Sequence, residues 1–306
     1  MSKTFKLGTR GSPLALTQAG MVRDALMAAP GWAEHGFDDV EIVEIRTTGD
    51  RVQNRALAEI GGKALWTKEL DRALLAGKVH ACVHSMKDVE TIRPGEIVIA
   101  AMLPRADVRD RLIGVDAIDD LPRGAVVGSS SPRRRAQLLR RRPDLSIVLF
   151  RGNVDTRLGK LATGEVDATL LAAAGLERLG RHDTGTPIPT DVMLPAPAQG
   201  AIGVETLADG SARALVAAIG CADTMACVLT ERALLAALKA DCHSPVGALA
   251  TINDGTITLK GELLAEDGHA HVAGCLGGRD GAAVGAALAA DLLGRAAPDV
   301  RRLFEG

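Results

Sequence analysis

The sequence predicts an α/β protein with mostly parallel sheets, followed by a small α+β domain. Over about the first two hundred residues, short apolar runs of strand length alternate with segments whose apolar residues recur at helical spacing. This alternation is typical of strand–helix–strand units and parallel sheets. After about residue 220 the pattern changes to a long helix, three strands and a final helix. The 306 residues are enough for two or three domains.

The individual elements follow from apolar periodicity and from residues that start or stop helices. A helix is predicted at residues 13–27, where Ser12 and Pro13 form a suitable N-cap and first turn, and another at residues 66–76 before Gly77. Strands are predicted at residues 4–8, 40–46, 79–84, 96–102, 125–128, 146–150, 167–171 and 201–205. The last part is predicted to form a helix at 224–240, strands at 246–251, 256–264 and 269–276, and a helix at 281–293.

Two segments indicate how the α/β region divides. The charged segment 103–111 is interpreted as a crossing between two sheets, and the proline-rich segment 186–198 as the return. We therefore expect two α/β domains joined by two strands, with a ligand-binding cleft between them. The predicted boundaries are residues 1–103 with 199–219, residues 104–198, and residues 220–306.

Composition excludes several classes of protein. Hydrophobic residues make up 47%, which supports a packed interior and argues against disorder. The net charge of −2 and the absence of tyrosine argue against a general nucleic-acid binder, and the charge also argues against a membrane-surface protein. No run of about 18 apolar residues predicts a membrane span, and the N-terminal segment MSKTFKLGTR has no apolar signal core.

The cysteines favour a cytoplasmic location. The chain has five, an odd number, and no CxxC spacing, so a disulfide framework is not expected. Cys242 follows the predicted helix 224–240 in a turn, where a thiol is accessible and His243 could favour the thiolate. From this segment alone, an inert buried cysteine is the favoured interpretation. The local signature of a papain-like nucleophile is absent.

Arginine is the unusual component of this sequence. The chain has 27 arginines and 9 lysines, and the arginine fork suits carboxylate or phosphate groups. Four predicted strands run into polar residues and then into a helix start, at residues 9–13, 84–88, 129–134 and 151–157. Open α/β sheets bind ligands at such strand ends. A capped helix start explains any one junction equally well, but four junctions that carry Arg or Lys favour an anion site.

The segment from Arg133 to Arg157 contains eight arginines and no lysine. Arg133 and Arg134 open a helix, where cations oppose the helix dipole, so a bound anion is the predicted explanation. Arg140–Arg142 close the helix, where cations are favourable, and are interpreted as a solvated end. A nucleic-acid patch is the competing interpretation, disfavoured by the low aromatic content.

Two further groups in residues 80–88 have alternative interpretations. Asp88 either forms an ion pair with Lys87 or a nearby arginine, or serves as an acid–base or charge-stabilising group. His80, Cys82 and His84 share one face of a strand and could suggest a metal. A core strand with satisfied histidines is the favoured interpretation, because no fourth ligand is evident.

A series of motifs runs along nearly the whole chain. They are TRGSPLALTQA, GGKALWTKEL, VHSMKDV, GSSSPRR, FRGNVDTRLGKL, LAAAGLERLG, PAQGAIGVE and DCHSPVGA. Together, and in this order, they resemble one family, the hydroxymethylbilane synthases, also called porphobilinogen deaminases.

The resemblance implies an enzyme that joins four porphobilinogen molecules, releases ammonia and yields hydroxymethylbilane for tetrapyrrole synthesis. It implies two domains like type II periplasmic binding proteins, a small α+β domain, and no metal. It also implies a dipyrromethane cofactor held by a thioether to Cys242, and catalysis by Asp88. The implied carboxylate-binding residues are Arg10, Ser12, Lys63, Lys87, Ser129, Ser131, Arg133, Arg134, Arg151, Arg157 and Arg178. We expect a monomer with porphobilinogen as its partner.

The sequence departs from the family pattern in a few places. Glu90 stands where proline is usual, Glu59 where some members have lysine, Trp66 where phenylalanine is common and Pro132 where leucine is usual. The loop around Cys242 reads ADCHSP instead of GGCQVP-like text. The alternative function is a non-catalytic binding protein for anionic solutes with the same two-domain shape.

Overall fold

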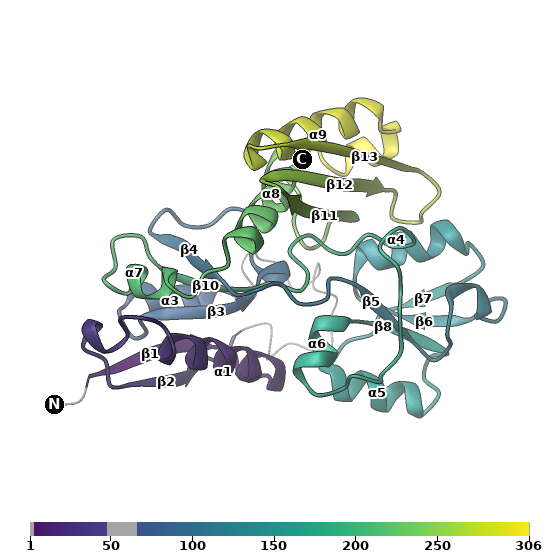
Figure 1. Ribbon diagram of the computed structural model, residues 1–306. Helices are drawn as coiled ribbons and strands as arrows, with labels where there is room; N and C mark the ends of the chain where they lie inside the picture. Colours follow the sequence, from purple (N-terminus) through teal and green to yellow (C-terminus); the bar gives the residue numbers. More distant parts are fainter. Residues whose placement is uncertain (1–2, 48–65, 306) are drawn as a thin grey trace. The chain divides into compact units, whose positions relative to one another are not determined.

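The computed structural model describes residues 3–47 and 66–305 (Figure 1). They form three sheets, of five, five and three strands. The predicted class, with two larger α/β sheets and a small C-terminal α+β part, is confirmed. Within the described ranges, no helix combines the length and the apolar character that crossing a bilayer requires.

The first sheet has the strand order β2-β1-β3-β10-β4. β1 is parallel to β2 and β3, whereas β10 is antiparallel to β3 and β4. The carboxyl ends of β1 and β3 therefore lie at the same edge of the sheet. The bounds are β1 Thr4–Thr9, β2 Asp39–Glu44, β3 Ala81–Ser85, β4 Ile97–Met102 and β10 Ile202–Leu207.

The helices beside the first sheet are α1 Pro13–Met27, α3 Lys68–Leu75 and α7 Ala212–Ala217, and a short 3-10 turn, η3 Met86–Asp88, follows β3. α1 begins as predicted, since the Ser12 hydroxyl accepts from Ala15 N at 3.3 Å. Its buried face includes Val22 and Leu26, which belong to the same core as Phe5 of β1. Burial of these apolar side chains holds α1 on the sheet and fixes where its first turn lies.

The second sheet has the order β7-β6-β8-β5-β9. β6 is parallel to β7 and β8, while β5 is antiparallel to β8 and β9. The strands are β5 Asp110–Ile113, β6 Val126–Gly128, β7 Ser146–Val148, β8 Ala168–Ala172 and β9 Thr186–Pro187. The helices that follow β6, β7 and β8 are α4 Pro132–Arg141, α5 Val154–Ala162 and α6 Ala173–Arg178.

The third sheet is an antiparallel meander with two helices packed on it. Its strands are β11 Val246–Asn253, β12 Thr256–Leu264 and β13 His271–Gly278. The helices are α8 Ala222–Leu238, α9 Gly281–Arg295 and the short α10 Pro298–Arg302. Leu234 of α8 and Leu288 of α9 share one core with Leu259 of β12. Figure 1 shows α9 lying along this sheet.

The described residues divide into two compact units. Unit 1 comprises residues 3–47, 66–106 and 200–225, and unit 2 comprises residues 107–199 and 226–305. Unit 2 thus contains both the second five-stranded sheet and the three-stranded sheet. The three-domain boundaries stated above remain a prediction.

The crossing expected at residues 103–111 also contains the start of a strand. The chain passes from unit 1 to unit 2 between residues 106 and 107, and β5 begins within the same segment, at Asp110. The segment carries alternating charges and little apolar pattern, so periodicity gave no sign of a strand there. Asp110 pairs in register with Ala172, at the carboxyl end of β8. The buried carboxylate of Asp110 therefore lies at the same edge of the sheet as the candidate binding residues that follow β6 and β7.

Candidate functional site

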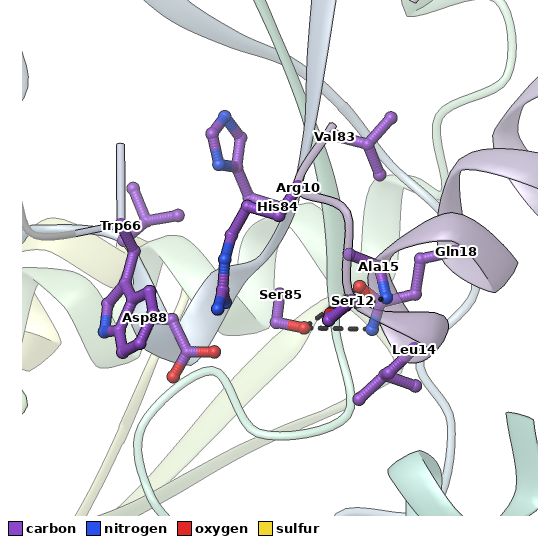
Figure 2. Close-up of a pocket in the computed structure, with 11 residues that line it drawn as sticks. Arg10, Ser12, Leu14, Ala15, Gln18, Trp66, Val83, His84, Ser85 and Asp88 are labelled. Atoms are coloured by element: carbon purple, nitrogen blue, oxygen red, sulfur yellow. Dashed lines mark hydrogen bonds between the residues drawn. The ribbon is translucent and has the colours of Figure 1, made fainter. Parts of the chain in front are cut away.

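In unit 1, a pocket lies where β1 and β3 end, and residues from both junctions line it (Figure 2). They include Arg10 and Ser12 after β1, Ser85 and Asp88 after β3, and Trp66 before α3. The parallel pairing of β1 and β3 explains why residues about 75 positions apart in sequence meet here. The junctions predicted at residues 9–13 and 84–88 therefore share one site.

Arg10 lies against an aromatic ring in this pocket. Its Cζ is 3.9 Å from the centroid of the Trp66 ring, within the range of a cation–π contact. Figure 2 shows the Asp88 carboxylate pointing toward the end of the Arg10 side chain, with Trp66 beside both. A cation, a carboxylate and a flat apolar face are thus presented together, a combination that suits an anionic aromatic ligand.

Tight packing fixes the turn that carries Lys87 and Asp88. Met86 is fully buried, and a Cβ added at Gly203 of β10 would collide with its Sδ. Ser85, at the end of β3, accepts from Gln18 Nε2 at 2.9 Å. Because β10 and α1 both hold this turn, Lys87 and Asp88 are half-buried at the sheet edge. Lys63, another predicted binding residue, lies outside the described residues.

In unit 2, the two serine-rich and arginine-rich junctions again lie at the ends of parallel strands. Ser129 and Ser131 follow β6, and Ser131 caps α4 by accepting from Arg134 N at 3.4 Å. Arg151 follows β7, and Arg157 in α5 donates from Nε to the carbonyl of Gly152 at 3.0 Å. Gly152 has φ +128°, a conformation that strongly favours glycine.

Two of the candidate arginines of unit 2, Arg151 and Arg178, are partly buried. Arg178 ends α6, which follows β8, and Arg151 is half-buried. For both side chains, burial lowers the pKa of the guanidinium from its usual value. A partly desolvated arginine interacts strongly with an anion. Ser129, Ser131, Arg151 and Arg157 thus lie after the neighbouring parallel strands β6 and β7, and Arg178 lies at the end of the helix that follows β8.

Arg133 and Arg134 have an anion within the protein itself. Their Nη2 atoms lie 2.9 Å and 2.7 Å from the two carboxylate oxygens of Asp110, and all three side chains are buried. Arg134 also donates to the carbonyl of Leu170 at 2.9 Å. A bound anion was the predicted explanation for cations at this helix start. Asp110 supplies the negative charge, so that prediction is wrong, and the positions of Arg133 and Arg134 do not by themselves indicate a ligand.

The buried pairing of Asp110 with Arg133 and Arg134 predicts how the stability of the fold depends on pH. Burial would raise the pKa of the Asp110 carboxyl, but the charges of Arg133 and Arg134, with hydrogen bonds from Arg134 and Gln199, hold it far below its usual value. The carboxylate therefore stabilises the fold above the unfolded pKa of about 4, and this contribution is lost as pH falls through the lower folded value. We expect Asp110→Asn to lower the free energy of unfolding by about 3–5 kcal/mol at pH 7, as measured by urea denaturation.

The matched control is Asp119→Asn. Asp119 pairs with Arg141 on the surface, where an ion pair contributes about 1 kcal/mol or less. The difference between wild type and Asp110→Asn should be constant from pH 8 to pH 5 and should shrink only under more acidic conditions. Equal stability of the two variants would contradict a structural role for Asp110.

Two of the three arginines at the other end of α4 behave as the sequence indicates. Arg140 and Arg141 are exposed, and Arg141 pairs with Asp119. Arg142 is instead half-buried: it pairs with Asp144 at 2.8 Å and donates to the carbonyls of Ile118 and Leu121. Arg140 and Arg141 alone therefore form a solvated helix end.

Cys242 lies on the exposed turn between α8 and β11. Asp241 Oδ1 accepts from His243 N at 2.8 Å, and Ser244 Oγ accepts from Asp241 N at 3.2 Å, so side chains of the loop itself hold the turn. The buried interpretation that the segment favoured is therefore wrong. Cys82 and Cys227 are buried, Cys221 is intermediate, and Cys275 is also exposed.

His80, Cys82 and His84, which alternate along β3 and the residue just before it, each contact another group of the protein. His80 Nδ1 accepts from Lys6 N at 2.8 Å, Cys82 donates to the carbonyl of Leu70 at 3.6 Å, and His84 Nε2 lies 3.2 Å from Glu205 Oε2. These contacts account for all three as parts of the core sheet.

Two family models match the chain. One, described as the dipyromethane cofactor binding domain of porphobilinogen deaminase, matches residues 5–214, well over half of the chain. The other, the C-terminal domain of porphobilinogen deaminase, matches residues 225–294. The chain belongs to the porphobilinogen deaminase family. The resemblance found in the sequence motifs is thereby confirmed.

Relatives of the family match over nearly their whole length. The porphobilinogen deaminase of Sphingopyxis alaskensis is 56% identical over 98% of this chain and 96% of its own. That of Paracoccus denitrificans is 52% identical over 96% of this chain and 95% of its own. Among solved structures, the VFT2 domain of Bordetella pertussis BvgS has a TM-score of 0.41 and 15% identity over 71% of this chain and 86% of that domain. A likeness this distant adds nothing to the assignment.

The departures from the family pattern have local explanations in the structure. Trp66 stacks on Arg10, and Pro132 occupies the first turn of α4, where its missing N–H is not needed. Glu90 accepts from Arg93 Nη1 at 2.9 Å. Asp241 and Ser244 shape the cysteine loop. Glu59 lies outside the described residues.

Proposed function

We propose that this chain acts as a porphobilinogen deaminase. It would join four porphobilinogen molecules head to tail, release four ammonia molecules and, by adding water, free the linear tetrapyrrole hydroxymethylbilane. The observation that carries the proposal is the pocket of unit 1, where Asp88, Arg10 and Trp66 lie together in a member of this family. We further propose a cytoplasmic monomer with the three-domain division predicted from the sequence.

The residues present fit a dipyrromethane cofactor attached to Cys242. That thiol is exposed, so a thioether can form at its Sγ. Each pyrrole bears an acetate and a propionate, and the cofactor with four added rings presents about a dozen carboxylates, which forked cations bind best. When bound, the cofactor supplies the pyrrole carbon to which the first substrate unit is joined.

Specific side chains would hold the substrate and cofactor carboxylates. In unit 1 they are Arg10, Ser12 and Lys87, with Lys63 proposed from the resemblance alone. In unit 2 they are Ser129, Ser131, Arg151, Arg157 and Arg178. Arg133 and Arg134 are proposed with them, but each would bind while it also contacts Asp110.

Asp88 would supply the central chemistry. Loss of ammonia from porphobilinogen leaves an electron-poor methylene-pyrrole cation. The Asp88 carboxylate, half-buried in the pocket, can accept from a pyrrole N–H and offset the developing positive charge. No step of this account requires a metal, because the nucleophile is a pyrrole carbon.

Turnover of porphobilinogen tests the proposal directly. The purified protein, incubated with porphobilinogen, should release four ammonia molecules for each hydroxymethylbilane formed. Ammonia is measured by assay, and the tetrapyrrole by the absorbance of the porphyrin that the product gives after cyclisation and oxidation. The alternative function, an anionic-solute-binding protein, predicts that calorimetry detects porphobilinogen binding without ammonia release. That result would overturn the proposal.

A further inference from the structure

A buried polar network in unit 1 is centred on Arg93. Its Nε and Nη2 atoms donate to the two carboxylate oxygens of Glu205, each at 2.8 Å. Nη2 also donates to Asp71 at 2.5 Å, and Nη1 donates to Glu90 at 2.9 Å and to Thr67 Oγ1 at 3.2 Å. The Arg93 side chain is only 9% exposed. One guanidinium thus joins three segments of the chain: the start of α3, strand β10 and the segment after β3 that carries Glu90 and Arg93 itself.

Three of these contacts lead directly to the pocket. Thr67 follows Trp66, and Glu90 lies two residues after Asp88, and both Trp66 and Asp88 line the pocket. Glu205 faces His84, another lining residue, at 3.2 Å. Thr67 also donates to Glu90 Oε2 at 2.7 Å. The network therefore links the segment bearing the aromatic ring to the segment bearing the carboxylate.

The hydroxyl of Thr67 does not cap the helix that follows it. Thr67 is at the N-cap position of α3, where threonine normally accepts from a backbone N–H of its own helix. Within the described part of the chain it makes no such cap. The hydroxyl instead bonds Glu90 and Arg93. Helix stability alone does not explain this arrangement.

The network is strongly held together. Burial would lower the pKa of the Arg93 guanidinium, but the hydrogen bonds and charges of Glu205 and Asp71 raise it. Burial would raise the pKa of Glu205, but His84 and Arg93 hold it at about 2. Charge-assisted hydrogen bonds from a planar fork restrict both distance and direction. Such a cluster keeps the attached segments in one geometry.

We infer that Arg93 is a positioning residue, which acts through Thr67 and Glu90 to hold Trp66 and Asp88 at a fixed separation across the pocket. The expected effect on turnover rests on the proposed function, because the separation between Trp66 and Asp88 affects a reaction rate only if the pocket is catalytic. A displacement of about 1 Å in a reacting group can reduce a rate a hundredfold. The fixed separation itself does not depend on the reaction.

The test breaks one link without removing a buried charge. Thr67→Val keeps the side-chain shape but cuts the contacts to Glu90 and Arg93. The matched control is Thr206→Val, because Thr206 is equally buried on β10 and its hydroxyl has no hydrogen-bond partner among the described residues. Both changes are made in a Trp32→Phe background, which leaves Trp66 as the single tryptophan of the chain.

Two readouts are measured on the cofactor-loaded proteins. In Thr67→Val, acrylamide quenching of Trp66 fluorescence should rise about twofold, and kcat for porphobilinogen should fall about tenfold while KM changes less than twofold. Thr206→Val should match the background protein in both. Arg93→Lys, which keeps the charge but loses the fork, should resemble Thr67→Val.

Distinct outcomes separate this inference from the proposed function. Unchanged quenching and a kcat within twofold of the background in Thr67→Val would overturn it. So would a lower Tm with normal kcat, since that result shows only a structural role. If the unsubstituted protein lacks turnover, the proposed function fails, and the quenching comparison still decides whether Thr67 positions Trp66.

Discussion

Cys242→Ser is expected to abolish turnover and to leave the protein at the mass of its bare sequence. A serine hydroxyl cannot form the thioether, so no cofactor would be retained to anchor the growing chain. Covalent anchoring replaces repeated binding steps with intramolecular ones, which accounts for a large share of the rate. Intact-protein mass spectrometry and the ammonia assay measure the two effects.

Cys275→Ser is the matched control for this change. Cys275 is also exposed, on β13 in the same unit, but it lies outside the family-like motif DCHSPVGA. It should retain the added mass and full activity. An active Cys242→Ser protein, or loss of the added mass in Cys275→Ser instead, would show that the attachment site has been assigned to the wrong cysteine.

Asp88→Ala is expected to reduce kcat by about a thousandfold while leaving the fold intact. The carboxylate is the group that would offset positive charge after ammonia leaves, and preorganised charges of this kind contribute about 10²- to 10³-fold each. The turn that carries Asp88 is held by Met86 packed beneath Gly203, so folding does not depend on the carboxylate. Single-turnover kinetics and the unfolding midpoint measure the two properties.

Two companion variants separate charge from packing. Asp88→Asn keeps the size of the side chain but loses its charge, and it should be nearly as inactive as Asp88→Ala. Asp209→Ala removes an exposed carboxylate of unit 1 outside the pocket and should be fully active. Normal kcat in Asp88→Ala would remove Asp88 from the mechanism.

Much of the fold was predictable because local patterns and tertiary structure agree. The helix Pro13–Met27 and the strand Thr256–Leu264 were predicted to the residue. Apolar periodicity and Ser-Pro capping chemistry decide such elements locally. The strand-end junctions were also predictable, since parallel strands place their carboxyl ends together. The structure shows them assembled within each unit.

The buried ionic contacts were not predictable in the same way. Asp110 lies in a charged segment that does not look like a strand, and its pairing with Arg133 depends on which strands become neighbours in the sheet. Likewise, the sequence comparison noted Glu90 only as a residue that stands where proline is usual. Its link to Thr67 depends on the packing of α3 against the end of β3, although its other partner, Arg93, is only three residues away in the sequence. Long-range charge pairing leaves no periodic signal in a sequence.

The intact mass of the purified wild-type protein tests the central claim most directly. A porphobilinogen deaminase with a dipyrromethane on Cys242 should exceed the mass of its 306-residue sequence by two pyrrole units. A fully active protein at the unmodified mass would contradict the proposed covalent cofactor and, with it, the role of Cys242.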